Sequence, residues 1–169
     1  MFSVLGKSFK TGCLTEKLPA HDKTASQLGS DVHKEIARIF GKSLAIRMVD
    51  AGSCNGCELE MHAVNNSFYD IERFGIHFVA SPRHADLLLV TGPVSRHMQA
   101  ALIRTYDAMP APKLVIAMGD CGADGGEFGV SYASCGAVAN VIPVDAVIRG
   151  CPPNPLQLLL GILEVLQRY

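Results

Sequence analysis

The 169-residue sequence contains no tryptophan, and charged residues make up only 18 % of it. Lysine and arginine (15) nearly balance aspartate and glutamate (16) and form no basic stripe, which argues against nucleic acid as a partner. No uncharged apolar run approaches the roughly 18 residues of a transmembrane helix. The first residues carry neither a continuous apolar signal core nor a twin-arginine pair. We therefore expect a cytoplasmic protein with no membrane span of its own.

Apolar residues make up 49 % of the chain. Such a balance fits either a sheet that is buried on both faces or an exterior that partly meets a partner. A chain of this length can bury a core without disulfides. Its six cysteines, in the absence of an export signal, are better explained by metal or redox chemistry than by a disulfide framework.

The sequence divides into residues 1–43 and a domain at 44–169. Residues 1 to about 30 are polar and show no sustained period, which predicts a tail. A short amphipathic helix follows, with Ser30 or Asp31 as its cap and an apolar stripe on one face.

From residue 44 onward, short apolar runs alternate with helical segments. Strands are predicted at 44–49, 76–80, 85–92 and 113–119, and a strand or extended pair at 141–150. Helices are predicted at 57–74, 95–109 and 154–169. Ser95 is expected to cap the second of these helices and Asn154 the third, with Pro155 in its first turn. Near-continuous apolar strands that alternate with helices indicate an α/β fold, an open parallel sheet with helices on both faces.

Four cysteines follow predicted strands. Cys54 and Cys57 come after the first strand, Cys121 after the fourth and Cys151 after the last. Because the carboxyl ends of parallel strands meet at one edge of a sheet, we expect these four thiols to converge there. Four converging thiolates suit either a tetrahedral zinc ion or a [4Fe–4S] cluster.

The neighbouring residues favour a cluster among the alternatives. The run GDCGADGGEFG leaves room around Cys121 for a bulky inorganic group. Cys151, followed by Pro152 and Pro153, resembles the Cys-Pro end of other cluster-binding runs. A phosphate loop is disfavoured because neither G-x-x-x-x-G-K-[ST] nor G-x-G-x-x-G occurs. A thioredoxin-like dithiol at CNGC would leave Cys121 and Cys151 unexplained. Structural zinc stays open, and we interpret Cys13 as a loose surface thiol and Cys135 as a small buried hydrophobe.

Four segments in order carry a family resemblance: GSCNGCELE, YDIERFGIHFVASPRHADLLLVTGPV, MGDCGADGG and VIPVDAVIRGCPP. Together they resemble the small subunit of complex I-related, membrane-bound [NiFe] hydrogenases of the formate hydrogenlyase type, and its homologue, the 20 kDa subunit of respiratory complex I. The resemblance covers about residues 44–168. It implies a flavodoxin-like fold and one [4Fe–4S] cluster, with Cys54, Cys57, Cys121 and Cys151 as its ligands.

The resemblance also implies a function, which is to relay electrons between ferredoxin-like clusters and a catalytic site in another subunit, with no catalytic residue in this chain. The implied partners are a large [NiFe]-hydrogenase-like catalytic subunit, a ferredoxin-like cluster subunit and integral membrane subunits. Through these partners the chain would lie peripherally on the cytoplasmic face of the inner membrane. Because the sequence ends at Tyr169 without further cysteines, we expect the single-cluster type.

The spacing of the first cysteine pair separates the branches of this family. Asn55 and Gly56 intervene between the cysteines as in the hydrogenases, whereas the resembling complex I subunits carry adjacent cysteines. The spacing therefore favours a hydrogenase. The alternatives are the quinone-side cluster subunit of a complex I-like NADH dehydrogenase, and a zinc-bound flavodoxin-like module with a role in assembly.

Several charged residues near these motifs are candidates for tuning or for contact between subunits. Glu58 and Glu60 fall in a first helical turn, where acids ordinarily complement the helix dipole, and the resemblance places this stretch against the large subunit. His62, four residues after Glu58, is placed to hydrogen-bond with it. The resemblance puts Arg83 and His84 near the cluster, where a positive charge would raise its potential; a solvated loop is the alternative.

Overall fold

The computed structural model describes residues 23–169, so Cys13 and most of the expected tail lie outside the described residues. Helix α2 (Lys23–Phe40) occupies the start of the described chain. The predicted cap at Ser30 or Asp31 is wrong, because α2 already runs through both positions. Leu28 continues the apolar stripe towards the N-terminus and is buried in the core. Packing thus extends a helix whose first residues look polar in the sequence.

Five strands form one open, all-parallel sheet: β1 (Leu44–Asp50), β2 (Ile76–Phe78), β3 (Leu87–Thr91), β4 (Leu114–Met118) and β5 (Ala146–Ile148). Their order across the sheet is β2-β1-β3-β4-β5, the order of flavodoxin-like folds. The predicted open parallel α/β sheet is therefore confirmed. The last predicted strand was too long, since only three residues of 141–150 pair with β4.

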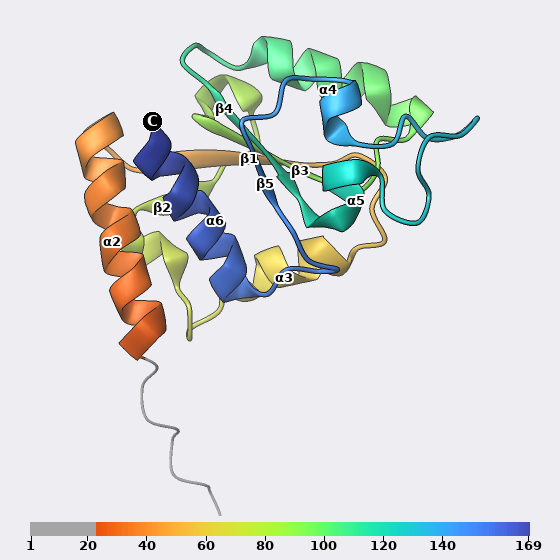
Figure 1. The fold of residues 1–169 in the computed structure, drawn as a ribbon. Coiled ribbons are helices and arrows are strands. Elements are labelled where there is room, and N and C mark those ends of the chain that lie inside the picture. Colours follow the sequence, from red (N-terminus) through yellow and green to blue (C-terminus); the bar gives the residue numbers. More distant parts are fainter. Residues whose placement is uncertain (1–22) are drawn as a thin grey trace, which may run out of the picture.

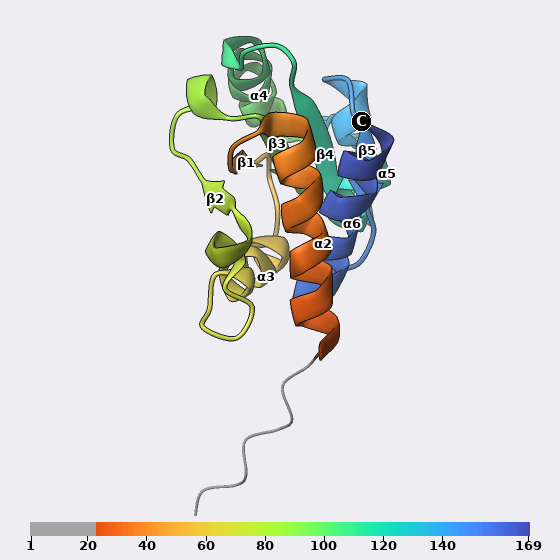
Figure 2. The same cartoon turned by 90° about the vertical axis from the view of Figure 1, so that its left-hand side faces the viewer.

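Helices cover both faces of the sheet (Figures 1 and 2). They are α2, α3 (Gly56–Val64), α4 (Arg96–Ala108), α5 (Gly119–Asp124) and α6 (Pro155–Arg168). Side chains of α2, α3 and α6 pack on one face in a core that includes Leu87 and Leu89, whereas α4 packs on the other face against Leu88 and Val90. Successive side chains of β3 alternate between the two cores, as the pleat of a strand requires. No helix in the described part of the chain is long and apolar enough to cross a membrane.

Both predicted helix caps of the domain are confirmed. Ser95 Oγ accepts a hydrogen bond from the backbone N–H of Met98 at 3.3 Å and starts α4. Asn154 Oδ1 accepts the N–H of Gln157 at 2.9 Å, and Gln157 Oε1 accepts the N–H of Asn154 at 2.8 Å. This reciprocal capping box, with Pro155 in the first turn, starts α6.

The helix predicted at 57–74 is wrong beyond its first half. Helix α3 ends at Val64, where Asn66 Oδ1 accepts the N–H groups of Phe68 and Tyr69 and turns the chain. A short 3₁₀ helix, η1 (Ile71–Phe74), then leads into β2. The side chain of Asn66 competes with the helix for backbone donors, which is the usual effect of asparagine in a turn. Two further 3₁₀ helices are η2 (Pro82–His84) and η3 (Val138–Asn140).

Candidate functional site

The four cysteines expected to converge lie around one cavity. Cys54 and Cys57 lie at the junction of β1 and α3, Cys121 lies in α5 directly after β4, and Cys151 follows β5. All four line a cavity of about 90 Å³ at the carboxyl edge of the sheet. The expected convergence is confirmed, while the group that these thiols hold stays a prediction. The segment around Cys121, Gly119–Asp124, forms the short helix α5, for which no helix was predicted.

Two glycines let the backbone approach these thiols closely. A Cβ atom at Gly119 would lie 2.8 Å from Cys57 Sγ, and one at Gly126 would lie 2.8 Å from Cys121 Sγ. Both glycines have positive φ angles, +83° and +53°, which side chains rarely adopt. The space beside the sulfur atoms is thus kept free of side chains, as the glycine-rich sequence predicted.

The four thiols supply a donor set that a metal centre can use. Structural zinc needs four ligands within about 2.3 Å of one centre. A [4Fe–4S] cluster instead presents a separate iron to each thiolate, so its four ligands stand further apart. Four thiols around a glycine-lined cavity therefore match the number of ligands that either group requires.

Burial and negative neighbours act on the thiols. Burial, followed by the charges of Glu58 and the other three cysteines, raises the pKa of Cys57 to about 12. Burial also raises the pKa of Cys121, with Cys151 and Cys54 adding to the effect. Redox-active dithiols show the opposite shift, because their thiolates must form at neutral pH. Cys57 and Cys121 are thus protonated in the metal-free chain, and a bound metal must displace their protons.

The buried side chain of Glu58 is hydrogen-bonded to the loop that carries Cys54 and Cys57. Glu58 is only 5 % exposed; it accepts a hydrogen bond from Ser53 Oγ at 2.5 Å and another from Thr91 Oγ1. Ser53 Oγ in turn accepts the N–H of Asn55 at 3.0 Å. The predicted hydrogen bond between Glu58 and His62 is wrong, because the carboxylate is taken by the two hydroxyl groups. Glu60, two residues further along α3, is partly exposed.

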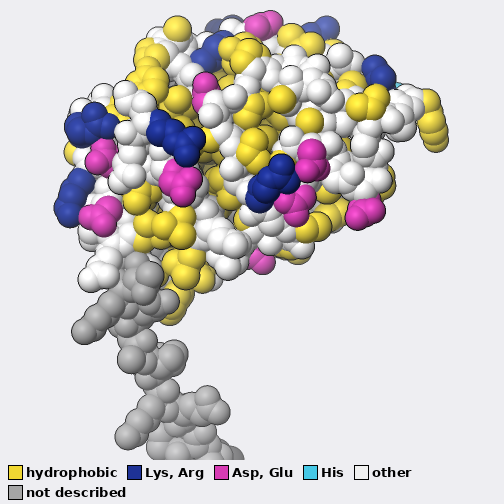
Figure 3. All heavy atoms as spheres, in the orientation of Figure 1, with side chains coloured by type: hydrophobic (Ala, Val, Ile, Leu, Met, Phe, Trp, Pro, Cys, Tyr) yellow, Lys and Arg dark blue, Asp and Glu magenta, His cyan; other side chains and the backbone are white. Residues whose placement is uncertain are grey.

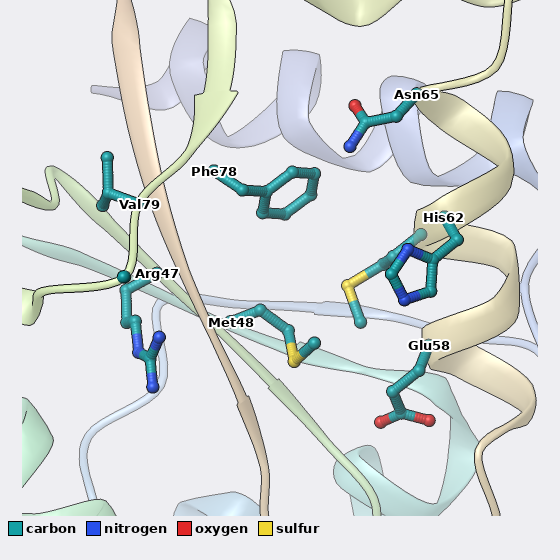
Figure 4. A pocket seen from close by; sticks show the side chains of 9 residues that line it. Arg47, Met48, Glu58, His62, Asn65, Phe78 and Val79 are labelled. Atoms are coloured by element: carbon teal, nitrogen blue, oxygen red, sulfur yellow. The ribbon is translucent and has the colours of Figure 1, made fainter.

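A second cavity, of about 290 Å³, lies beside Glu58 and was not predicted. Figure 4 shows Glu58 and His62 projecting from α3 into the cavity, which the ring of Phe78 enters from β2. Arg47 lines the same cavity, and its Nε atom is buried without a hydrogen-bond partner in the described part of the chain. The only signal for it in the sequence is a charged residue inside the apolar run LAIRMV.

Arg83 and His84 do not lie beside the cysteines. They belong to η2 and line a surface hollow together with Lys42 and Asp86. Lys42 lies just before the start of β1, whereas Cys54 and Cys57 follow the end of β1. This hollow is therefore at the amino edge of the sheet, opposite the cysteines. The expected position near the cluster is wrong. All strands are parallel, so the chain that leaves β2 has to return to the amino edge before β3 can begin.

The fifth described cysteine is separate from this site. Cys135 is buried, and its Sγ donates a hydrogen bond of 3.5 Å to Gln99 Oε1. It packs in the core on the α4 face of the sheet. The interpretation of Cys135 as a small buried hydrophobe is therefore confirmed.

Comparison with known families gives a match that begins at the first of the four cysteines. The profile of the family described as "NADH ubiquinone oxidoreductase, 20 Kd subunit" matches residues 54–165. The matched range contains all four cysteines that line the cavity.

Individual relatives are similar over most of the chain. Formate hydrogenlyase subunit 7 of Escherichia coli (strain K12) is 41 % identical over 86 % of this chain, but the match spans only 55 % of that relative. The probable membrane-bound hydrogenase subunit mbhJ of Pyrococcus furiosus is 41 % identical over 79 % of this chain and 80 % of its own. A chain in the solved structure of the membrane-bound sulfane sulfur reductase, an archaeal respiratory membrane complex, superimposes with a TM-score of 0.66 at 37 % identity and covers 80 % of this chain and 74 % of its own.

Proposed function

The chain belongs to the family of the 20 kDa subunit of NADH ubiquinone oxidoreductase, and from this membership we propose that it is an electron-transfer subunit of a membrane-associated [NiFe] hydrogenase complex. In this proposal one [4Fe–4S] cluster is held by Cys54, Cys57, Cys121 and Cys151. The observation that carries the proposal is the position of these four thiols around a single cavity.

The residues around the cavity have three tasks in this proposal. The four thiols hold the cluster, which supplies one-electron transfer when it is bound. Gly119 and Gly126 bring backbone rather than side chains up to the sulfur atoms. Glu58 fixes the loop that carries the first two thiols through Ser53 and Thr91. No residue of the chain is assigned a catalytic step, so electrons must enter and leave through partners.

The surface supports the proposal of partner subunits. Phe128, Val130 and Tyr132 are 67 %, 69 % and 98 % exposed and belong to the segment that follows α5 and projects from the body at the right of Figure 1. Figure 3 shows hydrophobic side chains reaching the surface at this end of the molecule. Exposed aromatic and aliphatic side chains in one segment favour burial against another protein. We assign as partners a large [NiFe]-hydrogenase-like catalytic subunit, a ferredoxin-like cluster subunit and integral membrane subunits, which would hold the chain on the cytoplasmic face of the inner membrane.

The C-x-x-C spacing supports the hydrogenase branch. Asn55 has a φ of 72°, a left-handed conformation that asparagine tolerates better than most residues. With Gly56 it forms the turn that lets Cys54 and Cys57 line the same cavity. Two similar proteins named as hydrogenase or hydrogenlyase subunits point in the same direction.

One observation favours a second candidate function, that of a quinone-side cluster subunit in a complex I-like dehydrogenase. The cavity beside Glu58 is lined largely by apolar side chains, including Met48, Met61 and Phe78. A largely apolar cavity with a few polar groups is the usual form of a small-molecule site. Purification of the intact complex followed by separate assays of hydrogen evolution and quinone reduction distinguishes the two candidates.

Anaerobic reconstitution of the full chain with iron and sulfide tests the cluster itself. We expect about four irons per chain and broad absorption near about 400 nm. Serine substitutions of Cys54, Cys57, Cys121 and Cys151 should each lower the iron content, whereas Cys135→Ser, away from the cavity, should not. A chain that contains zinc after purification, takes up no iron and stays colourless after reconstitution with iron and sulfide would contradict the proposal. It would favour the zinc-bound assembly module.

A further inference from the structure

The two segments that carry Cys121 and Cys151 are joined by a pair of reciprocal hydrogen bonds. The backbone N–H of Asp120 donates to Gly150 O at 3.0 Å, and the N–H of Gly150 donates to Asp120 Oδ1 at 3.1 Å. Each of these residues directly precedes one of the two cysteines. The last ladder pair of β4 and β5 is Met118 with Ile148, so the contact between Asp120 and Gly150 keeps the same register two residues further on.

The same arrangement occurs twice at the opposite edge of the sheet. Asp86 exchanges hydrogen bonds with Ala45, from N to O at 2.8 Å and from Ala45 N to Asp86 Oδ2 at 3.1 Å. Asp145 exchanges them with Val115, at 2.9 Å and 2.7 Å. In each case an aspartate uses its own backbone N–H and one carboxylate oxygen to hold the partner residue at the start of a strand. Asp120 makes this contact at the carboxyl edge, between two cysteine-bearing segments.

The surroundings of Asp120 reinforce this contact. Arg149 Nη1 lies 3.8 Å from Asp120 Oδ1 and 3.0 Å from Asp124 Oδ2. Arg149 and Asp124 are exposed and Asp120 is partly buried, so these ion pairs contribute little energy by themselves. Gly150 has a φ of +141°, and a Cβ atom there would lie 2.6 Å from Pro153 Cα. The turn before Cys151 therefore has a fixed backbone path, and its N–H group is satisfied by the Asp120 side chain.

We propose that Asp120 is a positioning residue, whose carboxylate sets the separation of Cys121 and Cys151 and thereby the stability and the reduction potential of the cluster that they hold. This inference rests on the proposed function. Groups that orient the ligands of a metal centre without touching the metal are known to tune both its affinity and its electronic properties. Removal of the side chain frees the N–H of Gly150 and leaves only one of the two hydrogen bonds between the segments.

The test compares three Asp120 variants of the full chain with a matched control after reconstitution. Asp120→Ala removes the acceptor, Asp120→Asn retains an acceptor oxygen, and Asp120→Glu retains the charge but displaces it. Asp145→Ala removes the equivalent side-chain acceptor at the amino edge, where Val115 N–H donates to Asp145 Oδ2. For each variant we measure the rate of bleaching by an iron chelator, the reduction potential and the electron paramagnetic resonance spectrum of the reduced cluster.

We expect Asp120→Ala to lose its cluster about tenfold faster than the wild-type chain, which is the scale of effect that such supporting groups have on metal affinity. Its potential and spectrum should also change. Asp120→Asn should restore most of the lifetime, and Asp120→Glu should not, so the inference stays testable if the alanine variant does not fold. Asp145→Ala should lower the free energy of unfolding while the potential and the spectrum stay at their wild-type values.

Two results would overturn this inference and leave the proposed function standing. One is a wild-type cluster lifetime and reduction potential in both Asp120→Ala and Asp120→Glu. The other is a shift of reduction potential in Asp145→Ala equal to that in Asp120→Ala. A wild-type chain that takes up no iron would overturn the proposed function and this inference with it. Iron uptake by the wild-type chain thus separates the two failures.

Discussion

Ser53 Oγ donates a 2.5 Å hydrogen bond to Glu58 Oε2, and so the residue before Cys54 is tied to the residue after Cys57. The same carboxylate accepts a hydrogen bond from Thr91 at the end of β3. One buried side chain therefore holds the cysteine loop, α3 and the sheet together. A carboxyl group with two hydroxyl donors is a well-satisfied buried group, which explains how this polar side chain is tolerated at a buried position.

Substitution of Glu58 by alanine should destabilise the chain. The change removes the acceptor of both hydroxyl groups, and loss of the partner of a buried polar group costs about 1–3 kcal/mol. The measurement is the free energy of unfolding in urea for the metal-free chain. Glu60→Ala is the control, because Glu60 is partly exposed on the same helix and ordinary surface changes stay within about 0.5 kcal/mol. Equal losses of unfolding free energy in the two variants would show that Glu58 does no more than complement the dipole of α3.

Substitution of Gly119 by alanine should reduce cluster loading. Its Cβ would lie 2.8 Å from Cys57 Sγ, at a φ of +83°. Gly129→Ala separates the two causes, because Gly129 also has a positive φ, +50°, but a Cβ there meets no atom within 4 Å. Both variants should lose some stability from backbone strain, whereas only Gly119→Ala should lower the iron content after reconstitution. Normal iron content in Gly119→Ala would refute the role given to this close approach.

The metal-free chain should lose stability as the pH rises from about 9 towards about 12. Burial raises the pKa of Cys57 from 9.0 to about 12, so the fold binds this proton more tightly than the unfolded chain does. The resulting stabilisation is fully present below the unfolded pKa and is lost as the pH rises through the folded one. The comparison is between urea midpoints of wild type and Cys57→Ser at pH 8 and pH 10.5. The variant should decline less over this interval, and parallel declines would contradict the shift.

Substitution by alanine should destabilise the chain at Asn154, which caps α6, but not at Ser30, which lies inside α2. Asn154→Ala removes the side-chain oxygen of the capping box of α6 and should cost about 0.5–2 kcal/mol of stability. Ser30, once expected as a cap, lies inside α2, where its Oγ donates to Ser26 O at 3.0 Å. Ser30→Ala should therefore be neutral or slightly stabilising, because alanine has the higher helix propensity. Thermal unfolding measures both, and a loss at Ser30 similar to that at Asn154 would argue against the long α2.

Much of the fold could be predicted because it depends on local patterns. The apolar runs of the strands and the caps at Ser95 and Asn154 are visible in the sequence, and the structure contains all of them. The start of α2 was missed because its first turns are polar and are held in a helix by packing of residues such as Leu28 in the core. The long helix predicted at 57–74 failed because the side chain of Asn66 turns the chain after α3.

The sequence by itself determined that the cysteines at 54, 57, 121 and 151 would meet, because each follows a strand and parallel strands end at one edge. Only the tertiary structure decided that Arg83 and His84 lie at the other edge, that Glu58 binds Thr91, and that Asp120 holds Gly150. The two hydrogen bonds join residues 33 and 30 positions apart in the chain. Local pattern carries no signal for such pairs, because the residues meet only after the strands and helices that carry them have packed together.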